Sequence, residues 1–134
     1  MKKALIKKTI VAGALGVALV GVGEAAFAGY QNEAYDVIAP KLQFAAYTGP
    51  QEKAYTARDG YATVNFVGST YKVNLQMCNY LLPYCGGTQV FGIDEGGSAY
   101  LENNYNDGTD VTMRVVVSTT NAVNVQVQGY WRSD

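Results

Sequence analysis

The stretch Val111-Thr112-Met113-Arg114-Val115-Val116-Val117-Ser118 decides the fold class of this chain. Its apolar side chains recur at every second position: Val111, Met113, Val115 and Val117. A period of two places successive side chains on opposite faces of a β-strand, whereas a helix would need a period near 3.6. The stretch therefore predicts a strand with one face on a core and the other in water.

The same alternation recurs along the chain, and turn-forming pairs such as Asp59-Gly60 and Asp107-Gly108 separate the runs. We expect strands near residues 41–47, 54–58, 61–67, 71–78, 88–94, 98–104, 110–118 and 122–131. About eight short strands with turns between them predict an all-β fold, a small antiparallel β-sandwich or a partly open barrel. The last two strands should form a hairpin across residues 119–121, and residues 88–104 should form another across 95–97.

The first 28 residues have the pattern of a cleaved secretory signal. A head with four lysines precedes an apolar run at residues 10–23, and Ala26-Phe27-Ala28 supplies the small residues of a cleavage site. A membrane anchor is the alternative, but a span needs roughly 18–20 apolar residues and this run has about 14. The sequence predicts export, a mature chain from Gly29 and no membrane span after cleavage.

The segment that follows the leader is ambiguous. Residues 30–38 fit a helical turn, a first edge strand or a loose arm, and Pro40 ends whichever forms. The predicted organisation is a signal peptide at 1–28, an N-terminal arm or edge strand at 29–40, and a β-sandwich domain at 41–134.

Charge restricts the partners of the predicted mature chain. After residue 28 there are six Lys and Arg against ten Asp and Glu. Nucleic acids and anionic lipids need clustered basic residues, so neither is expected as a partner. We expect a protein that is secreted and either free or loosely associated with the cell wall.

The segment from Cys78 to Cys85 is the sharpest local feature. Two cysteines in an exported protein predict a disulfide, which on the chain-entropy estimate stabilises the fold by about 2.5 kcal/mol. Inside this ring lie Tyr80, Leu81, Leu82, Pro83 and Tyr84. Loop tips are usually polar, so an apolar tip held in a ring indicates a contact surface. The alternatives are a purely structural crosslink and a loop folded back over the core.

Tyrosine is the second feature, because all eleven tyrosines follow the leader. A tyrosine offers a flat face and a polar tip, which suit protein or sugar surfaces. By strand phase, Tyr61 and Tyr71 should point inward. The tyrosines expected at the surface are Tyr47, Tyr55, Tyr80, Tyr84, Tyr100 and Tyr105. Tyr105 joins residues 80–84 as a candidate for partner binding, although tyrosines that serve only as strand formers are the alternative.

Metal and catalytic chemistry find little support. Residues 102–110 partly match a calcium loop, but Tyr105 interrupts the ligand pattern and an Asn-Asp-Gly turn explains the segment better. The chain has no histidine, so Ser-His and Cys-His nucleophiles are absent and zinc is not expected. Asp94 and Glu102 could form a carboxylate pair, but Asp94 fits a turn. We expect no enzyme, no metal and no cofactor.

Two motifs carry a resemblance to a known group. They are Tyr71-Lys72-Val73-Asn74-Leu75 and, near the end, Val127-Gln128-Gly129-Tyr130-Trp131. With the leader, they make the chain resemble small exported single-domain β proteins of unknown function from spore-forming Gram-positive bacteria. The resemblance implies an extracellular location and a compact β fold. It implies no activity and carries no site residue across.

These observations favour a secreted, non-enzymatic binding or surface-associated protein that contacts a protein or cell-envelope partner through loops. One alternative is a bacteriocin-like antimicrobial effector or its exported accessory. Another is a protease inhibitor that presents residues 79–84 as a substrate mimic. The sequence leaves the partner and the oligomeric state open.

Overall fold

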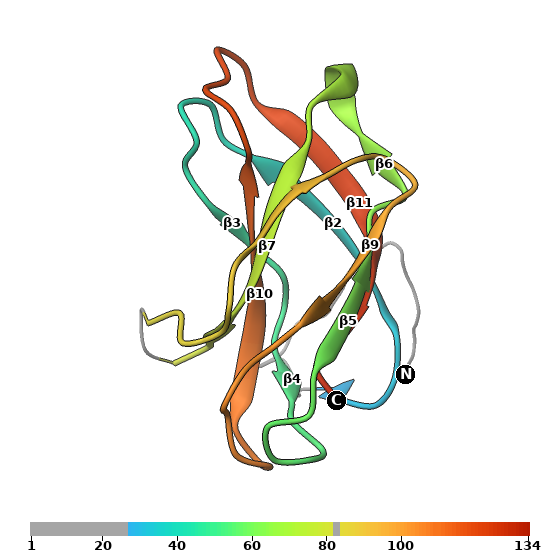
Figure 1. Ribbon diagram of the computed structural model, residues 1–134, viewed down its shortest axis with the longest axis vertical. Helices are drawn as coiled ribbons and strands as arrows, with labels where there is room; N and C mark the ends of the chain where they lie inside the picture. The colour runs from blue at the N-terminus through green and yellow to red at the C-terminus, as the bar shows by residue number, and fades with distance from the viewer. Residues whose placement is uncertain (1–26, 82–83) are drawn as a thin grey trace, which may run out of the picture.

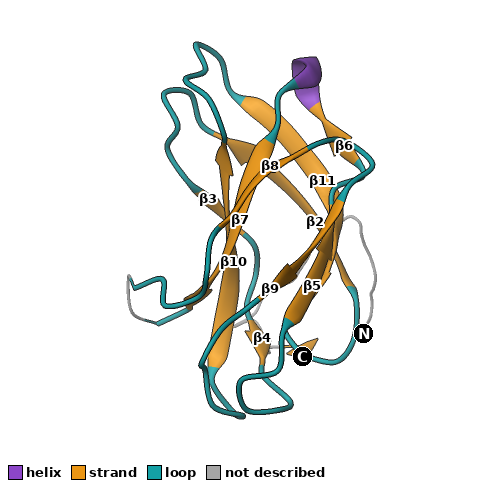
Figure 2. Cartoon of the chain, viewed as in Figure 1, coloured by secondary structure: helices purple, strands orange, loops and turns teal. Residues whose placement is uncertain are grey.

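The computed structural model describes residues 27–81 and 84–134, which form two β-sheets packed face to face (Figures 1 and 2). The predicted all-β sandwich is confirmed. The predicted leader lies outside the described residues, except for Phe27 and Ala28. Within the described residues, no helix is long and apolar enough to cross a membrane.

One sheet has six strands in the order β1-β4-β10-β7-β8, with β3 also paired to β10. Its strands are β1 (Phe27–Ala28), β3 (Ala46–Tyr47), β4 (Gln51–Glu52), β7 (Val73–Asn79), β8 (Val90–Ile93) and β10 (Asp110–Val117). All pairs are antiparallel except β1 with β4. The long central pair is β10 with β7, in a register that sets Met113 opposite Met77.

The other sheet has five strands in the order β2-β11-β5-β9, with β6 also paired to β11. Its strands are β2 (Glu33–Ala39), β5 (Gly60–Thr63), β6 (Phe66–Val67), β9 (Ser98–Leu101) and β11 (Val125–Arg132). A short 3₁₀ turn, η1 (Gly68–Thr70), follows β6. Of the three expectations for residues 30–38, the edge strand is confirmed, because β2 lies at the edge of this sheet.

The core lies between the two sheets, and its inward positions follow the predicted alternation. The predicted exposure of the other face is wrong for β10, because Thr112 and Val116 on that face are also buried. On β10, the buried inward positions are Val111, Met113, Val115 and Val117. They meet Leu75 and Met77 from β7, and Val127 and Trp131 from β11, in one apolar cluster. Removal of this apolar surface from water is the main favourable contribution to folding.

Gly129 allows a tight crossing in β11. A Cβ placed at this residue would collide with the Thr63 carbonyl oxygen and lie 2.8 Å from the Tyr35 hydroxyl. That hydroxyl donates a hydrogen bond to the same Thr63 oxygen at 2.7 Å, and burial raises the pKa of the Tyr35 phenol. The glycine is required because no larger side chain fits beside this buried tyrosine.

Both predicted hairpins are wrong. β10 pairs with β7 in the six-stranded sheet, whereas β11 pairs with β2, β5 and β6, so residues 118–124 cross between the sheets. Asn121 holds this crossing, because its fully buried side chain accepts from Gln43 N and donates to the carbonyls of Pro40 and Val123. In the same way β8 and β9 belong to different sheets, and residues 94–97 form the turn between them.

Two predicted strands are also wrong, wholly or in part. Of residues 41–47 only 46–47 form a strand, and Leu42 and Gln43 adopt left-handed φ angles of 64° and 59°. Residues 54–58 form a turn in which Ala57 has a φ of 58° and donates to the Tyr105 carbonyl. A left-handed residue breaks the extended backbone that a strand needs.

A lysine that the sequence did not single out closes one end of the sandwich. The Lys53 side chain is 1% exposed, and its ammonium donates to the main-chain oxygens of Arg58, Ser133 and Asp134 at 2.7, 2.8 and 3.0 Å. Burial lowers the pKa of Lys53 to about 8, against the opposing effect of Asp134. Nearby, Asp134 N donates to the Gly29 carbonyl at 2.6 Å, so the two ends of the described chain meet (Figure 1).

Candidate functional site

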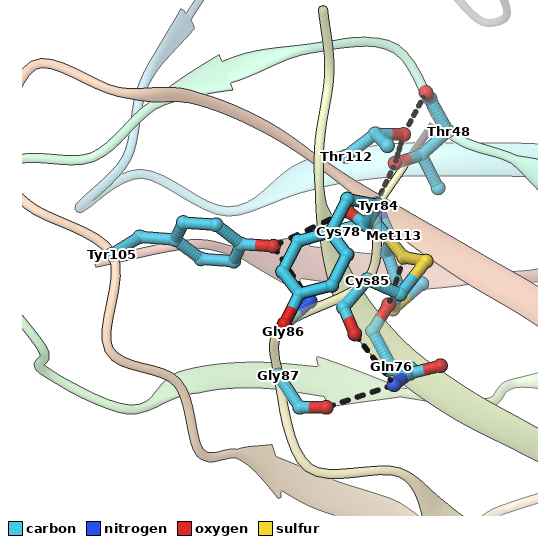
Figure 3. The surroundings of a disulfide bond; sticks show 10 residues. All are labelled: Thr48, Gln76, Cys78, Tyr84, Cys85, Gly86, Gly87, Tyr105, Thr112 and Met113. Atoms are coloured by element: carbon cyan, nitrogen blue, oxygen red, sulfur yellow. Dashed lines mark hydrogen bonds between the residues drawn. A yellow bond between two sulfur atoms is a disulfide. The ribbon is translucent and has the colours of Figure 1, made fainter. Parts of the chain in front are cut away.

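The predicted disulfide between Cys78 and Cys85 is present (Figure 3). Cys78 belongs to β7, opposite Thr112 of β10. Because Met77 points into the core, the next side chain, Cys78, points to the outer face of the six-stranded sheet. The strand therefore fixes one end of the ring, and the disulfide holds Cys85 beside it.

Backbone hydrogen bonds fix the base of the loop that the ring encloses. Asn79 N donates to the Tyr84 carbonyl at 2.9 Å, across the loop. Tyr80 N donates to the Asp110 carbonyl at 2.9 Å, which ties the loop to the start of β10. Leu81 N donates to the side-chain oxygen of Asn79 at 2.9 Å. The entry and exit of the loop are thus held by polar contacts in addition to the disulfide.

Tyr105 supports the outgoing side of the loop from a distant part of the chain (Figure 3). Its hydroxyl accepts from Gly86 N at 2.8 Å and donates to the Tyr84 carbonyl at 3.4 Å. Its ring is partly buried and packs against the core. Sequence reasoning placed Tyr105 among the partner contacts, and the structure shows its hydroxyl bonded to the loop.

Gln76 and Gly87 fix the segment after Cys85 against strand β7. The Gln76 amide donates to the carbonyls of Gly87 and Cys85 at 2.8 and 3.4 Å. Gly87 N donates to the Met77 carbonyl at 3.0 Å, and a Cβ at Gly87 would lie 2.7 Å from that oxygen. Only glycine allows this close approach of the two backbones.

The apolar side chains described at the tip extend into solvent. Leu81 is 75% exposed and Tyr84 is 66% exposed, and Tyr80 is also exposed. For these three residues the loop does not fold back over the core. Leu82 and Pro83, the other two candidates, lie outside the described residues.

The remaining tyrosines show where strand phase was a good guide and where it was not. Tyr47, Tyr55 and Tyr100 are exposed, as expected. Tyr61 was expected to point inward, which is wrong. Gly60 and Ala62 take the buried phase of β5, so Tyr61 lies on the outer face with its ring 5.1 Å from that of Tyr100.

The polar segment 102–110 forms a turn. Gly108 has a φ of 82° and donates to the Lys53 carbonyl at 2.8 Å. The Asn103 amide donates to the carbonyls of Arg58 and Leu101, and Asp107 accepts from the Thr56 hydroxyl. These side chains therefore bond to neighbouring loops. Among residues 27–81 and 84–134, no group of three or more acidic, histidine or cysteine side chains is placed to hold a metal ion.

Comparison of the chain with protein-family models, with curated proteins and with solved structures found no match. The resemblance to small exported β proteins of spore-forming bacteria therefore stays a prediction.

Proposed function

We propose that this protein is an extracellular, non-enzymatic binding domain that contacts a protein partner through the loop from Cys78 to Cys85. The observation that carries the proposal is the exposure of Leu81 and Tyr84 on a loop fixed at its base. Covering such side chains removes apolar surface from water. Because the base of the loop is already held in place, little conformational freedom is lost there on binding.

The oxidised state of the cysteines supports the location. The disulfide joins both cysteines of the sequence. Stable disulfides belong mainly to oxidising compartments, and the predicted leader would deliver the chain to one.

Leu81→Ser tests the loop, and Leu42→Ser is the matched control. Both leucines are exposed, but Leu42 lies in the loop before β3, away from the disulfide. Each purified, oxidised variant is immobilised and exposed to the culture medium and surface proteins of the producing cells. We expect a protein retained by the wild type and by Leu42→Ser but not by Leu81→Ser. Equal retention by all three would contradict the proposal.

Unfolding measurements separate binding from stability. A surface substitution of this kind should change the free energy of unfolding by less than about 0.5 kcal/mol. A much larger loss in Leu81→Ser would mean that the loop supports the fold instead of presenting a contact.

The same variants distinguish the two alternative roles of the loop. A protease inhibitor would slow subtilisin-like or elastase-like enzymes at micromolar concentration, and Leu81→Ser would relieve the inhibition. An antimicrobial effector would inhibit the growth of related strains. Either result would replace the binding role with a more specific activity.

A further inference from the structure

The outer face of the five-stranded sheet carries a second set of exposed aromatic rings, away from the disulfide loop. Strand register places them side by side: Phe66 opposite Gln128, Tyr61 opposite Arg132, and Tyr100 opposite Tyr61. Tyr130 is two positions along β11 from each of Gln128 and Arg132, so it shares their face. We call Tyr61, Phe66, Tyr100 and Tyr130 the aromatic face.

Three of the four rings of the aromatic face are exposed, Tyr61 is partly buried, and the rings are partly fixed. Tyr100 is 65% exposed, and Phe66 and Tyr130 are also exposed. The Tyr61 ring packs against Tyr100 at 5.1 Å, and the Arg132 guanidinium lies 5.0 Å from the centre of the Tyr61 ring. These contacts restrict the rings before any ligand arrives, which lowers the entropy lost on binding.

Polar side chains beside the rings are also held in place. The two carboxylate oxygens of Asp36 accept from the amide nitrogens of Gln126 and Gln128 at 2.9 and 3.0 Å. Each amide is thereby oriented, and within the described residues neither amide oxygen accepts a hydrogen bond. Both oxygens remain available to hydroxyl donors of a ligand.

Charge decides which ligand suits this surface. The side chains beside the four rings are Asp36, Gln126, Gln128 and Arg132, which include one acid and one base. The Arg132 Nε lies 3.5 Å from a carboxylate oxygen of Asp134. No cationic cluster is present in this set of residues, and the whole sequence has a net charge of −1. An anionic polymer would gain little here, whereas a neutral ligand meets no repulsion.

We infer that the aromatic face binds a neutral, pyranose-based polysaccharide. The C–H face of a sugar ring stacks on an aromatic ring, and its hydroxyls donate to the amide oxygens of Gln126 and Gln128. A protein partner would favour a continuous apolar centre, whereas here Gln126, Gln128 and Asp36 form a polar row along one side of the rings. The inference goes beyond the proposed function, because this surface belongs to the other sheet and to another class of ligand.

The test is co-sedimentation of the purified, oxidised protein with insoluble chitin and with insoluble cellulose, both neutral pyranose polymers. We expect the wild type to pellet with at least one of them. Binding should survive about 0.5 M NaCl, which screens exposed charges. Absence of pelleting with both polymers would overturn the inference.

Tyr100→Ala and Tyr130→Ala locate the site, and Phe91→Ala is the matched control. Phe91 is also an exposed aromatic residue but belongs to β8 of the six-stranded sheet. We expect about tenfold weaker binding for each tyrosine variant and none of this loss for Phe91→Ala. Equal binding by all the variants would overturn the inference. Two tyrosine variants are used so that misfolding of one, detected by thermal unfolding, does not decide the result.

Leu81→Ser separates this inference from the proposed function. The variant should pellet with the polysaccharide as the wild type does, while it loses the protein partner. Loss of pelleting in Leu81→Ser, with the aromatic-face variants unaffected, would place the sugar on the loop instead.

Discussion

The tip of the disulfide loop and the Lys53 site both reverse the usual distribution of residues. At the loop, Leu81 and Tyr84 extend into water. At the other site, an ammonium group is enclosed by protein and bonded to three main-chain oxygens. Buried charges are expensive unless they are fully hydrogen-bonded, and exposed apolar tips contribute little to folding.

The difference shows which feature serves the fold. Lys53 donates hydrogen bonds to main-chain oxygens of residue 58 and of residues 133–134. Both segments lie outside the strands, so Lys53 links them. The three hydrogen bonds offset the free-energy cost of burying the ammonium. The hydrogen bond of Leu81 to the Asn79 side chain uses its backbone N–H, and its apolar side chain is exposed. The exposed side chain therefore contributes little to stability. Substitutions should therefore affect the two regions very differently.

Lys53→Met should have the largest effect on stability. The methionine keeps most of the apolar stem but leaves the main-chain oxygens of Ser133 and Asp134 without this donor, whereas Arg58 keeps the Asn103 amide. The loss should lower the free energy of unfolding by about 3 kcal/mol. Chemical denaturation measures the change. Lys72→Met is the control, because Lys72 is exposed and makes only a surface ion pair with Asp94 at 3.8 Å. Similar losses in both variants would contradict the role given to Lys53.

Replacement of both cysteines by alanine should have the next largest effect. Loss of this short ring should lower the free energy of unfolding by about 2.5 kcal/mol, because the unfolded chain regains freedom. Unlike Lys53→Met, it should also abolish partner capture by the loop. Reduction of the wild-type disulfide should reproduce both changes. Retained capture after reduction would show that the ring is not needed to present Leu81.

Tyr105→Phe should have a smaller effect. The phenylalanine keeps the packed ring but removes the hydroxyl that holds Gly86 and Tyr84, which should cost about 1 kcal/mol. Partner binding should weaken because the loop is less fixed. Tyr55→Phe, at an exposed tyrosine outside the loop, should change neither property. The comparison fails if both variants bind and unfold like the wild type.

A separate effect should appear in the pH dependence of stability. The pKa of Lys53 is lowered to about 8 in the folded protein from 10.5, so the unfolded chain binds more protons between these values. Stability should therefore rise with pH from about 8 toward 10. Thermal unfolding between pH 7.5 and 9.5 measures it, and Lys53→Met should show no such rise.

The pH rise should end near pH 10 because of Tyr35. Burial raises the pKa of its phenol above the value of 10.0 in the unfolded chain. Ionisation of the unfolded chain then favours unfolding as pH increases further. A stability that fell steadily from pH 8 would contradict the assignment for Lys53.

Alternation of apolar residues predicted the strands with long, clear patterns and most of their core residues. Residues 71–78 and 110–118 correspond closely to β7 and β10, because one face of each lies on the core. Pairing was not predictable in the same way. A turn signal such as Thr119-Thr120-Asn121 marks a change of direction but does not say whether the next strand stays in the sheet.

The candidate site was predicted only in part. The disulfide followed from two cysteines and a leader, but the support from Tyr105 depends on a contact between residues far apart in sequence. Lys53 gave no signal, because a single lysine among polar neighbours is normally solvated. The phase of Tyr61 was misjudged because both Tyr61 and Ala62 can occupy a core position, and packing chose the smaller residue.

The pairing of β2 with β11 has a consequence for the order of folding. Glu33 stands opposite Trp131 and Ala39 opposite Val125, so the first long strand lies against the last. Closing such a distant contact is slow, and the five-stranded sheet and the core it covers cannot be completed until β11 is available. The chain therefore stays unfolded while it emerges, whether from the ribosome or from an export pore. The Cys78–Cys85 ring needs only its own few residues and can close before the sheets assemble.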